Sequence, residues 1–283
     1  MGLYCLSWTQ ICAPYAITVT ILLTGALGQI GQSISRSFLA QGAKLILADV
    51  NLEASAAFSA EMQAAGIPEE NFLMQELDIT DEASCSRCVE KSIEAFGRID
   101  VLINNAAIDA KFDKAGEGQI NNSRFEYYPL DALRRSVEVN LVGTVLITQV
   151  VCRQMLKQGH GNIINVASTY SLVAPNQSLY DYGSGVSQFK PVDYIASKSF
   201  IPNFTRYLAT FYARNNIRCN ALVPHGIFNN HPEPFLKNWE RLSPMGRMCE
   251  RDELNGPFTF LASDASSYMT GSVISVDGGW TAW

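Results

Sequence analysis

Short apolar runs alternate with longer segments of helical spacing along most of this chain. The apolar runs, which favour strands, cover residues 18–23, 44–49, 72–76, 101–104, 162–166, 218–223 and 273–276. The amphipathic segments, which favour helices, include residues 29–41, 52–65, 82–96, 131–158, 192–214 and 251–261. Strands that alternate with helices build βαβ units and a parallel sheet with helices on both faces. The pattern therefore predicts an α/β protein with a doubly wound Rossmann fold and a central parallel sheet of about seven strands.

Composition narrows the class of protein without changing this fold. Of the 283 residues, 47% are hydrophobic, enough for a full core, and no repeat or linker divides them, so a single domain is predicted. With 21 basic and 27 acidic side chains the net charge is −6, which argues against a nucleic-acid partner. The odd number of cysteines, 7, favours free thiols in a reducing cytoplasm. Cys85 and Cys88 form a C-x-x-C without a second pair at metal-ligand spacing, so we expect a structural role and no metal site.

The beginning of the chain carries no charged residue through position 35. Polar residues and Pro14 interrupt its apolar run, and no basic residue precedes that run. Neither a membrane span nor a signal peptide is therefore predicted. We interpret residues 1–17 as an N-terminal extension and expect a cytoplasmic protein without a membrane partner.

Three stretches that follow predicted strands are candidates for binding a substrate. Residues 109–128 and 172–191 are long and polar, and residues 225–247 come after the sixth predicted strand. Long connections in compact domains are either functional or disordered, and open α/β sheets bind ligands beyond the carboxyl ends of their strands. We expect 172–191 and 225–247 to form substrate-side loops.

A glycine-rich turn lies between the first predicted strand and the first predicted helix. It reads TGALGQIG, with Gly25, Gly28 and Gly31 separated in part by Gln29 and Ile30. Glycine lets the backbone approach a pyrophosphate closely, and a helix amino terminus favours its negative charge. The turn therefore predicts a dinucleotide site.

Asp49 closes the second predicted strand. A carboxylate at this place accepts hydrogen bonds from the ribose hydroxyls of NAD and repels the 2′-phosphate of NADP. Neither Ala26 nor Leu27 supplies the basic side chain that an NADP site would use. We therefore expect NAD(H) as the cofactor, the alternative being that Asp49 only caps the following helix.

Tyr194 and Lys198 are four residues apart and share one face of a predicted helix. A phenol ionises near pH 10, too high for a base at neutral pH, and a nearby ammonium lowers that pKa. Ser168, which follows a predicted strand, can bind the substrate oxygen. Together they predict a site for proton transfer, although each alone could be an ordinary helix or turn residue.

Six motifs in register resemble those of the short-chain dehydrogenases/reductases, over nearly all of residues 18–280. They are Tyr194-Ile-Ala-Ser-Lys198, Ser168, Asn140 in VEVNLVGT, NNAA at 104–107, Asp78 and DGG at 277–279. The resemblance implies a single-domain oxidoreductase that uses NAD(H) to interconvert a secondary alcohol and a ketone, with Asn140, Ser168, Tyr194 and Lys198 as catalytic residues. It implies that Asn140 orders a water linking Lys198 to solvent, and that Lys198 binds the nicotinamide ribose.

The same resemblance implies further cofactor contacts and an assembly. Beyond the glycine turn and Asp49, the implied cofactor contacts are Asp78, Ile79, Asn105, Ala106, Tyr194, Lys198, Pro224, Gly226 and Ile227. Asn104 is implied to shape the sheet edge beneath the cofactor. Family members of this size form dimers or tetramers, so we expect a homodimer or homotetramer.

Two departures from the family pattern concern branch and spacing. Gln29 stands where single-domain members usually have glycine, as in the extended branch, but no further substrate domain follows the DGG motif, so we expect the single-domain branch. The interval from Ser168 to Tyr194 is longer than usual. Tyr180 lies nearer the usual distance, but Ser184 occupies the position of its lysine, so Tyr194 is the expected acid/base.

A third departure is His225, which follows Pro224 where the family commonly has glycine. His225 either contacts the nicotinamide or the substrate, or it is a solvated loop residue.

The segments STYSLVAPNQSLY, PVDYIASK, NNHPEPFL and PMGRM resemble a narrower group, the flagellin-modification oxidoreductases of nonulosonic-acid pathways. The polar stretch before Tyr194, which includes Lys190, suits a sugar-like substrate better than an acyl chain. Expected substrate contacts are Tyr170, Gln188 and His225. A 3-oxoacyl thioester reductase, a polyol dehydrogenase and a non-catalytic NAD(H)-binding sensor are the alternatives.

Overall fold

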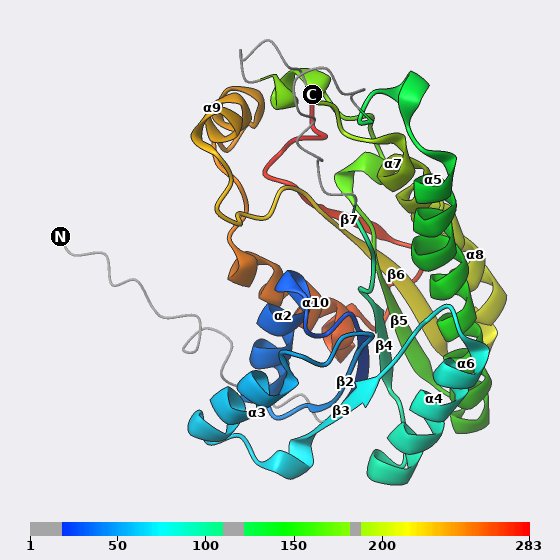
Figure 1. The fold of residues 1–283 in the computed structure, drawn as a ribbon. Helices are drawn as coiled ribbons and strands as arrows, with labels where there is room; N and C mark the ends of the chain where they lie inside the picture. The colour runs from blue at the N-terminus through cyan, green and yellow to red at the C-terminus, as the bar shows by residue number, and fades with distance from the viewer. Residues whose placement is uncertain (1–18, 110–121, 182–187) are drawn as a thin grey trace.

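The computed structural model describes residues 19–109, 122–181 and 188–283 (Figure 1). The extension expected over 1–17 lies outside the described residues, as do parts of the two polar stretches. Seven strands form one parallel sheet in the order β3-β2-β1-β4-β5-β6-β7. They are β1 Thr20–Thr24, β2 Lys44–Asp49, β3 Phe72–Glu76, β4 Val101–Asn104, β5 Gly161–Val166, β6 Ile217–Pro224 and β7 Val273–Val276. The predicted fold class is confirmed.

Helices cover both faces of this sheet and enclose two separate cores (Figure 1). They are α2 Gln29–Ala40, α3 Ser55–Ala64, α4 Glu82–Phe96, α5 Leu130–Val137, α6 Thr144–Gln158, α7 Val192–Lys198, α8 Ile201–Tyr212, α9 Glu233–Leu242 and α10 Asn255–Ala262. On β1, Ile21 and Leu23 pack in the core with α2, α3 and α10, whereas Leu22 packs in the core with α4, α6 and α8. A strand that is buried on both faces needs apolar residues at consecutive positions, which explains the uninterrupted runs in the sequence.

Two of the predicted helices are interrupted where they pass the carboxyl edge of the sheet. The range 131–158 contains a π-helical turn, Glu138–Gly143, between α5 and α6. The range 192–214 divides between α7 and α8, because Pro202 near the beginning of α8 has no N–H to continue the ladder of α7. Periodicity alone does not predict either break.

The substrate-side range 225–247 is not wholly a loop, because it contains α9. Phe235 and Trp239 of α9 pack with Leu179, Tyr180 and two further buried residues, Met248 and Trp280, in a small third core. Figure 1 shows α9 above the carboxyl ends of the strands, near the carboxyl terminus of the chain. Burying these aromatic side chains stabilises a helix where the sequence pattern indicated only a connection.

The helical run Leu130–Gln158 has the length and hydropathy of a membrane span, but half of its most apolar window is buried within the fold, as in a core helix.

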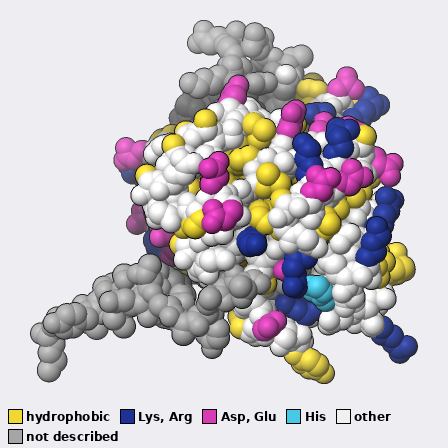
Figure 2. Space-filling view, turned by 90° about the horizontal axis from the view of Figure 1, so that it is seen from below, with side chains coloured by type: hydrophobic (Ala, Val, Ile, Leu, Met, Phe, Trp, Pro, Cys, Tyr) yellow, Lys and Arg dark blue, Asp and Glu magenta, His cyan; other side chains and the backbone are white. Residues whose placement is uncertain are grey.

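Cys85 and Cys88 are free and buried, and burial raises their pKa values to about 12 and about 11, so both thiols stay protonated at neutral pH. The face of the molecule seen from below in Figure 2 carries acidic and basic side chains interspersed with apolar ones.

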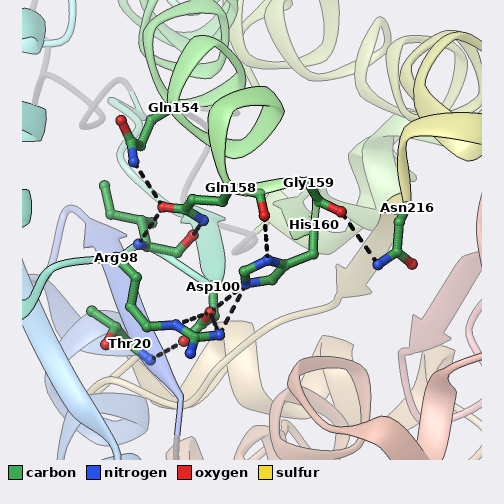
Figure 3. A network of polar contacts seen from close by, with 9 residues as sticks. Thr20, Arg98, Asp100, Gln154, Gln158, Gly159, His160 and Asn216 are labelled. Atoms are coloured by element: carbon green, nitrogen blue, oxygen red, sulfur yellow. Dashed lines mark hydrogen bonds and ion pairs between the residues drawn. The ribbon is translucent and has the colours of Figure 1, made fainter.

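A polar network joins the amino ends of the three central strands (Figure 3). The buried carboxylate of Asp100, just before β4, accepts hydrogen bonds from Thr20 N at 2.8 Å and from Arg98 Nε at 2.7 Å. Its Oδ1 also lies 2.8 Å from His160 Nε2, just before β5. One carboxylate therefore holds the beginnings of β1, β4 and β5 together, at the edge opposite the candidate site.

Replacing Asp100 with alanine should lower the free energy of unfolding by about 2–3 kcal/mol, because the buried N–H of Thr20 loses its acceptor and two basic side chains lose theirs. Urea denaturation measures the change, and an alanine at the exposed Asp131, which forms a surface ion pair with Arg134, serves as the control. Equal stability of the two variants would contradict a structural role for the Asp100 network.

Candidate active site

A cavity of about 770 Å³ follows the carboxyl ends of the strands. It brings together most of the site residues expected from the sequence, although they come from widely separated parts of the chain. Those that line it are Gly25, Gly28, Gln29, Ile30, Asp49, Asp78, Ile79, Asn105, Ala106, Ser168, Tyr170, Tyr194, Lys198, Pro224, His225, Gly226 and Ile227. Gly31, Asn140 and Gln188 do not line it.

The glycine turn allows two close backbone approaches. Gly25 has φ +64°, and a Cβ there would lie 2.8 Å from Cα of Ala106. A Cβ on Gly31 would lie 2.2 Å from the carbonyl oxygen of Gly25, so Gly31 packs α2 against the turn and does not face a ligand. Gly28 precedes α2 without a capping side chain, which leaves the first N–H groups of the helix directed at the cavity. The Gln29 amide donates to the carbonyl of Phe228 at 2.8 Å and ties the turn to the segment after β6.

Asp49 and Asp78 lie at the end of the cavity where the adenosine of the cofactor is expected, and they accept different hydrogen bonds from the protein. Asp49 accepts from Leu27 N at 3.0 Å and Asn51 N at 3.1 Å while lining the cavity. Asp78 accepts from the hydroxyl and N–H of Thr80 at 2.7 and 2.9 Å, and these hydrogen bonds lower the pKa of its carboxyl. Both carboxylates line the cavity and keep acceptor capacity toward it.

Two neighbouring asparagines at the end of β4, Asn104 and Asn105, make different contacts. Asn105 lines the cavity and donates through its amide to the carbonyls of Thr24 and Gly25 at 3.1 and 2.9 Å. Asn104 is buried beneath and donates at 2.8 Å to Thr148 and to Asn165 on the neighbouring β5. The pair locks the glycine turn to the centre of the sheet.

Tyr194 and Lys198 project from the short helix α7 into the cavity, as their spacing predicts, and Ser168 faces them from the end of β5. Burial and the charge of Asp109 raise the phenol pKa of Tyr194, and the neighbouring Ser168 hydroxyl lowers it by less. The net shift of the pKa is upward, whereas the sequence led us to expect a lowering by Lys198.

Lys198 is itself desolvated. The residue is 3% exposed, and its Nζ donates to the carbonyl of Val166 at 2.8 Å. Burial lowers the pKa of Lys198 to about 8, although the charge of Asp109 opposes this. The ammonium therefore still predominates at pH 7 and is lost as the pH rises through about 8.

Asn140 is fully buried in the π-helical turn and touches backbone, not the cavity. Its amide accepts from Ile108 N at 2.8 Å and donates to Ile108 O and to the hydroxyl of Ser197, both at 2.9 Å. The side chain thus joins the segment after β4 to the helix that carries Tyr194. The water relay through Asn140 stays a prediction.

Of the expected substrate contacts, Tyr170 and His225 line the cavity and Gln188 does not. The hydroxyls of Tyr170 and Tyr180 are 3.0 Å apart. His225 is buried with ring centroids 4.4 Å from Trp239 and from Trp280, and burial lowers its pKa to about 4. Among the described residues its Nε2 has no hydrogen-bond partner, so the view of His225 as a solvated loop residue is wrong.

Lys190 takes the place expected for Gln188, because two hydrogen bonds between Gln177 and the Lys190 backbone fix the segment there. Asp109 reaches the same cavity from the segment after β4. Sequence reasoning used Asp109 only as the boundary of a polar stretch, although a carboxylate a few residues beyond a strand end is itself a signal. The aromatic wall of Phe235 and Trp239 was missed because nothing in the pattern indicated α9.

Comparison with known proteins places this geometry in a family. Residues 25–281 match the family model described as enoyl-(acyl carrier protein) reductase. The chain is 32% identical to 7α-hydroxysteroid dehydrogenase of Bacteroides fragilis, over 92% of this chain and 93% of that one. The protein is a short-chain dehydrogenase/reductase. The predicted family and its oxidoreductase activity are thereby confirmed, and its cofactor is a nicotinamide dinucleotide, NAD or NADP.

Solved structures of short-chain dehydrogenases agree in fold but differ in cofactor. A short-chain dehydrogenase of Leptospira borgpetersenii with bound NAD+ has a TM-score of 0.78 and 29% identity, covering 93% of each chain. A gluconate 5-dehydrogenase of Burkholderia cenocepacia in complex with NADP and tartrate has a TM-score of 0.79 and 26% identity, covering 94% of this chain and 96% of that one.

Replacing Tyr194 with phenylalanine should reduce kcat by about 1000-fold, because the site loses its proton donor and acceptor. NADH affinity, measured by fluorescence titration, should stay nearly unchanged, since the ring still fills its place. Phenylalanine at the exposed Tyr268, which does not line the cavity, is the matched control. Full turnover by the Tyr194 variant would remove this residue from its expected role.

The kcat/KM for NADH should fall as pH rises through about 8, because this parameter reports ionisations of the free enzyme and Lys198 has its pKa lowered to about 8 there. Above that pH the site loses the ammonium expected to bind the cofactor ribose, whereas an unperturbed lysine stays charged to about pH 10. A pH series of ketone-reduction rates measures this. A profile that is level up to about pH 10 would contradict it.

Proposed function

We propose that this short-chain dehydrogenase/reductase uses NAD(H) to interconvert a secondary alcohol and a ketone on a polar, sugar-like substrate, with Tyr194 as general acid and base. The observation that carries the proposal is the convergence of Ser168, Tyr194 and Lys198 in one cavity with the glycine turn. A protein that only sensed NAD(H) would have no use for a serine, a tyrosine and a lysine that converge beside the substrate position.

The side chains divide the chemistry between them. When bound, the nicotinamide supplies or accepts the hydride at the substrate carbon. Ser168 holds the substrate oxygen, and Tyr194, kept neutral by its raised pKa, gives that oxygen a proton during reduction. In the reverse direction Tyr194 must ionise, and Lys198 contributes most in its protonated form, because an ammonium stabilises the phenolate.

The choice of NAD(H) over NADP(H) rests on Asp49. Its carboxylate lies in the cavity at the end of β2, where ribose hydroxyls would donate to it and a 2′-phosphate would be repelled. The neighbouring cavity residues Leu27, Val50 and Asn51 offer no positive charge to offset that repulsion.

The proposal of a hydroxylated substrate rests on the mixed chemistry of the substrate side. Asp109, Lys190 and the two tyrosine hydroxyls give polar groups, while Trp239 gives an aromatic face against which the C–H face of a sugar ring packs. The narrower resemblance to flagellin-modification oxidoreductases stays a prediction consistent with such a substrate.

Two alternatives have their own support. The apolar wall that includes Phe235 and Met248 favours a 3-oxoacyl thioester reductase, in line with the description of the matched family. A polyol dehydrogenase is supported by the likeness to gluconate 5-dehydrogenase. The alternatives differ in substrate, not in the proposed acid/base.

We further propose a homodimer or homotetramer in the cytoplasm. The exposed apolar side chains of Tyr207 and Phe211 on α8 and of Phe125 near α5 suit burial against a second copy. The two tryptophans of the carboxyl-terminal tail differ in burial: Trp280 packs in the third core of its own chain, whereas Trp283 is 82% exposed.

With NADH as cofactor, kcat/KM for hydroxylated ketones should exceed kcat/KM for β-ketoacyl thioesters by at least about tenfold. For the same ketones, kcat/KM with NADH should exceed kcat/KM with NADPH by the same factor. In each case one polar contact is lost, which costs about 1.4 kcal/mol or more. The absorbance change at the nicotinamide band measures all four combinations. Replacing Asp49 with serine should raise the kcat/KM for NADPH relative to NADH, and serine at the exposed Glu69 is the control.

Three results would decide against parts of this function. Turnover of thioesters alone would reject the sugar-like substrate, and a preference for NADPH would reject the assignment to Asp49. Binding of NADH without hydride transfer in stopped-flow experiments would favour the sensor.

A further inference from the structure

An ion pair lies in the substrate cavity directly beside Tyr194. The Nζ of Lys190 is 2.6 Å from each carboxylate oxygen of Asp109 and 4.4 Å from the centre of the Tyr194 ring. The side chain of Lys190 is 8% exposed and that of Asp109 is 49% exposed. The ammonium of Lys190 is therefore buried in the wall of the cavity, and the carboxylate of Asp109 is the more accessible of the two charged groups.

Both members of the pair are presented by anchored backbone. Lys190 N donates to the amide oxygen of Gln177 at 2.9 Å, and the Gln177 amide donates back to Lys190 O. On the other side, Asn140 binds both the N–H and the carbonyl of Ile108, immediately before Asp109. Two segments far apart in the sequence thus hold opposite charges at one point of the cavity.

The pair keeps hydrogen-bonding capacity for a ligand. An ammonium has three donors and a carboxylate about four acceptor sites. Within the described part of the chain, the side-chain hydrogen bonds of Lys190 and Asp109 join them to each other, and the ammonium also lies over the Tyr194 ring. A donor on the ammonium and acceptor sites on the carboxylate are thus left for a group that enters the cavity.

The chemistry of such a group follows from charge balance. The pair is neutral as a whole, so a ligand carboxylate gains attraction from Lys190 but meets repulsion from Asp109. An apolar ligand would remove water from both charges without replacing its hydrogen bonds. An uncharged hydroxyl suits both, because it donates to the carboxylate and accepts from the ammonium.

We propose that Lys190 and Asp109 together bind an uncharged hydroxyl on the carbon next to the one that exchanges hydride. Their place beside Tyr194 sets this position, and the inference rests on the proposed function of the same site. The preferred substrates are then vicinal diols in oxidation and α-hydroxy ketones in reduction. Lys190 and Asp109 determine specificity, while Tyr194 exchanges the proton.

The test compares cis-cyclohexane-1,2-diol with cyclohexanol as substrates for NAD+ reduction, since the two differ by the one hydroxyl in question. The wild-type enzyme should prefer the diol by at least about 100-fold in kcat/KM, because a site built for a hydroxyl discriminates strongly against its absence. K190M and D109N should each lower this ratio of the two kcat/KM values below about tenfold, because the hydroxyl that the pair binds is present only in the diol. The matched controls are K237M and E233Q, which break an exposed ion pair of 2.8 Å on α9.

A charged probe separates recognition from a merely structural role. D109N leaves the ammonium of Lys190 unpaired, so it should raise the kcat/KM for 2-hydroxycyclohexane-1-carboxylate at least about tenfold, whereas K190M should not. Equal losses on both alcohols, or a diol preference unchanged in both variants, would overturn the proposed recognition while the oxidoreductase function stood. If neither alcohol yields NADH in the wild-type enzyme, the proposed function fails and the inference fails with it.

Discussion

Parallel pairing of all seven strands brings every carboxyl end to one edge of the sheet, and each part of the site depends on that constraint. The glycine turn follows β1, Asp49 ends β2, Asn105 follows β4 and Ser168 follows β5. Residues more than a hundred positions apart therefore meet in one cavity without any loop having to reach far. The opposite edge is closed by the Asp100 network, so binding and cohesion are separated at the two ends of the strands.

Inside the cavity, desolvation decides the protonation states more than proximity does. Lys198 is buried and Tyr194 is half-buried, and desolvation favours the neutral form of each: it raises the pKa of the phenol and lowers that of the ammonium. The phenol is therefore neutral near pH 7, the form needed to protonate a ketone. Asp109 adds to this bias, since its negative charge opposes formation of a phenolate nearby.

The substrate side is built from elements outside the common sheet. The aromatic wall comes from α9, and the Lys190–Asp109 pair comes from the two polar stretches. Similar sheets serve a hydroxysteroid dehydrogenase and a gluconate 5-dehydrogenase, so the fold leaves the substrate open. Selectivity must then come from how these added groups present charge and ring faces to the cavity.

The sequence by itself determined the strands, the family and the residues that meet at the carboxyl edge. Buried strands need continuous apolar runs, and six motifs in register identify a family where a glycine turn or a tyrosine–lysine pair alone would not. Only the tertiary structure decided the break between α7 and α8, the role of Asn140 as a backbone clamp, the place of Lys190 instead of Gln188, and the upward pKa shift of Tyr194. Each of these depends on which distant groups share a buried volume, and hydrogen-bond partners and desolvation are properties of that volume, not of local sequence.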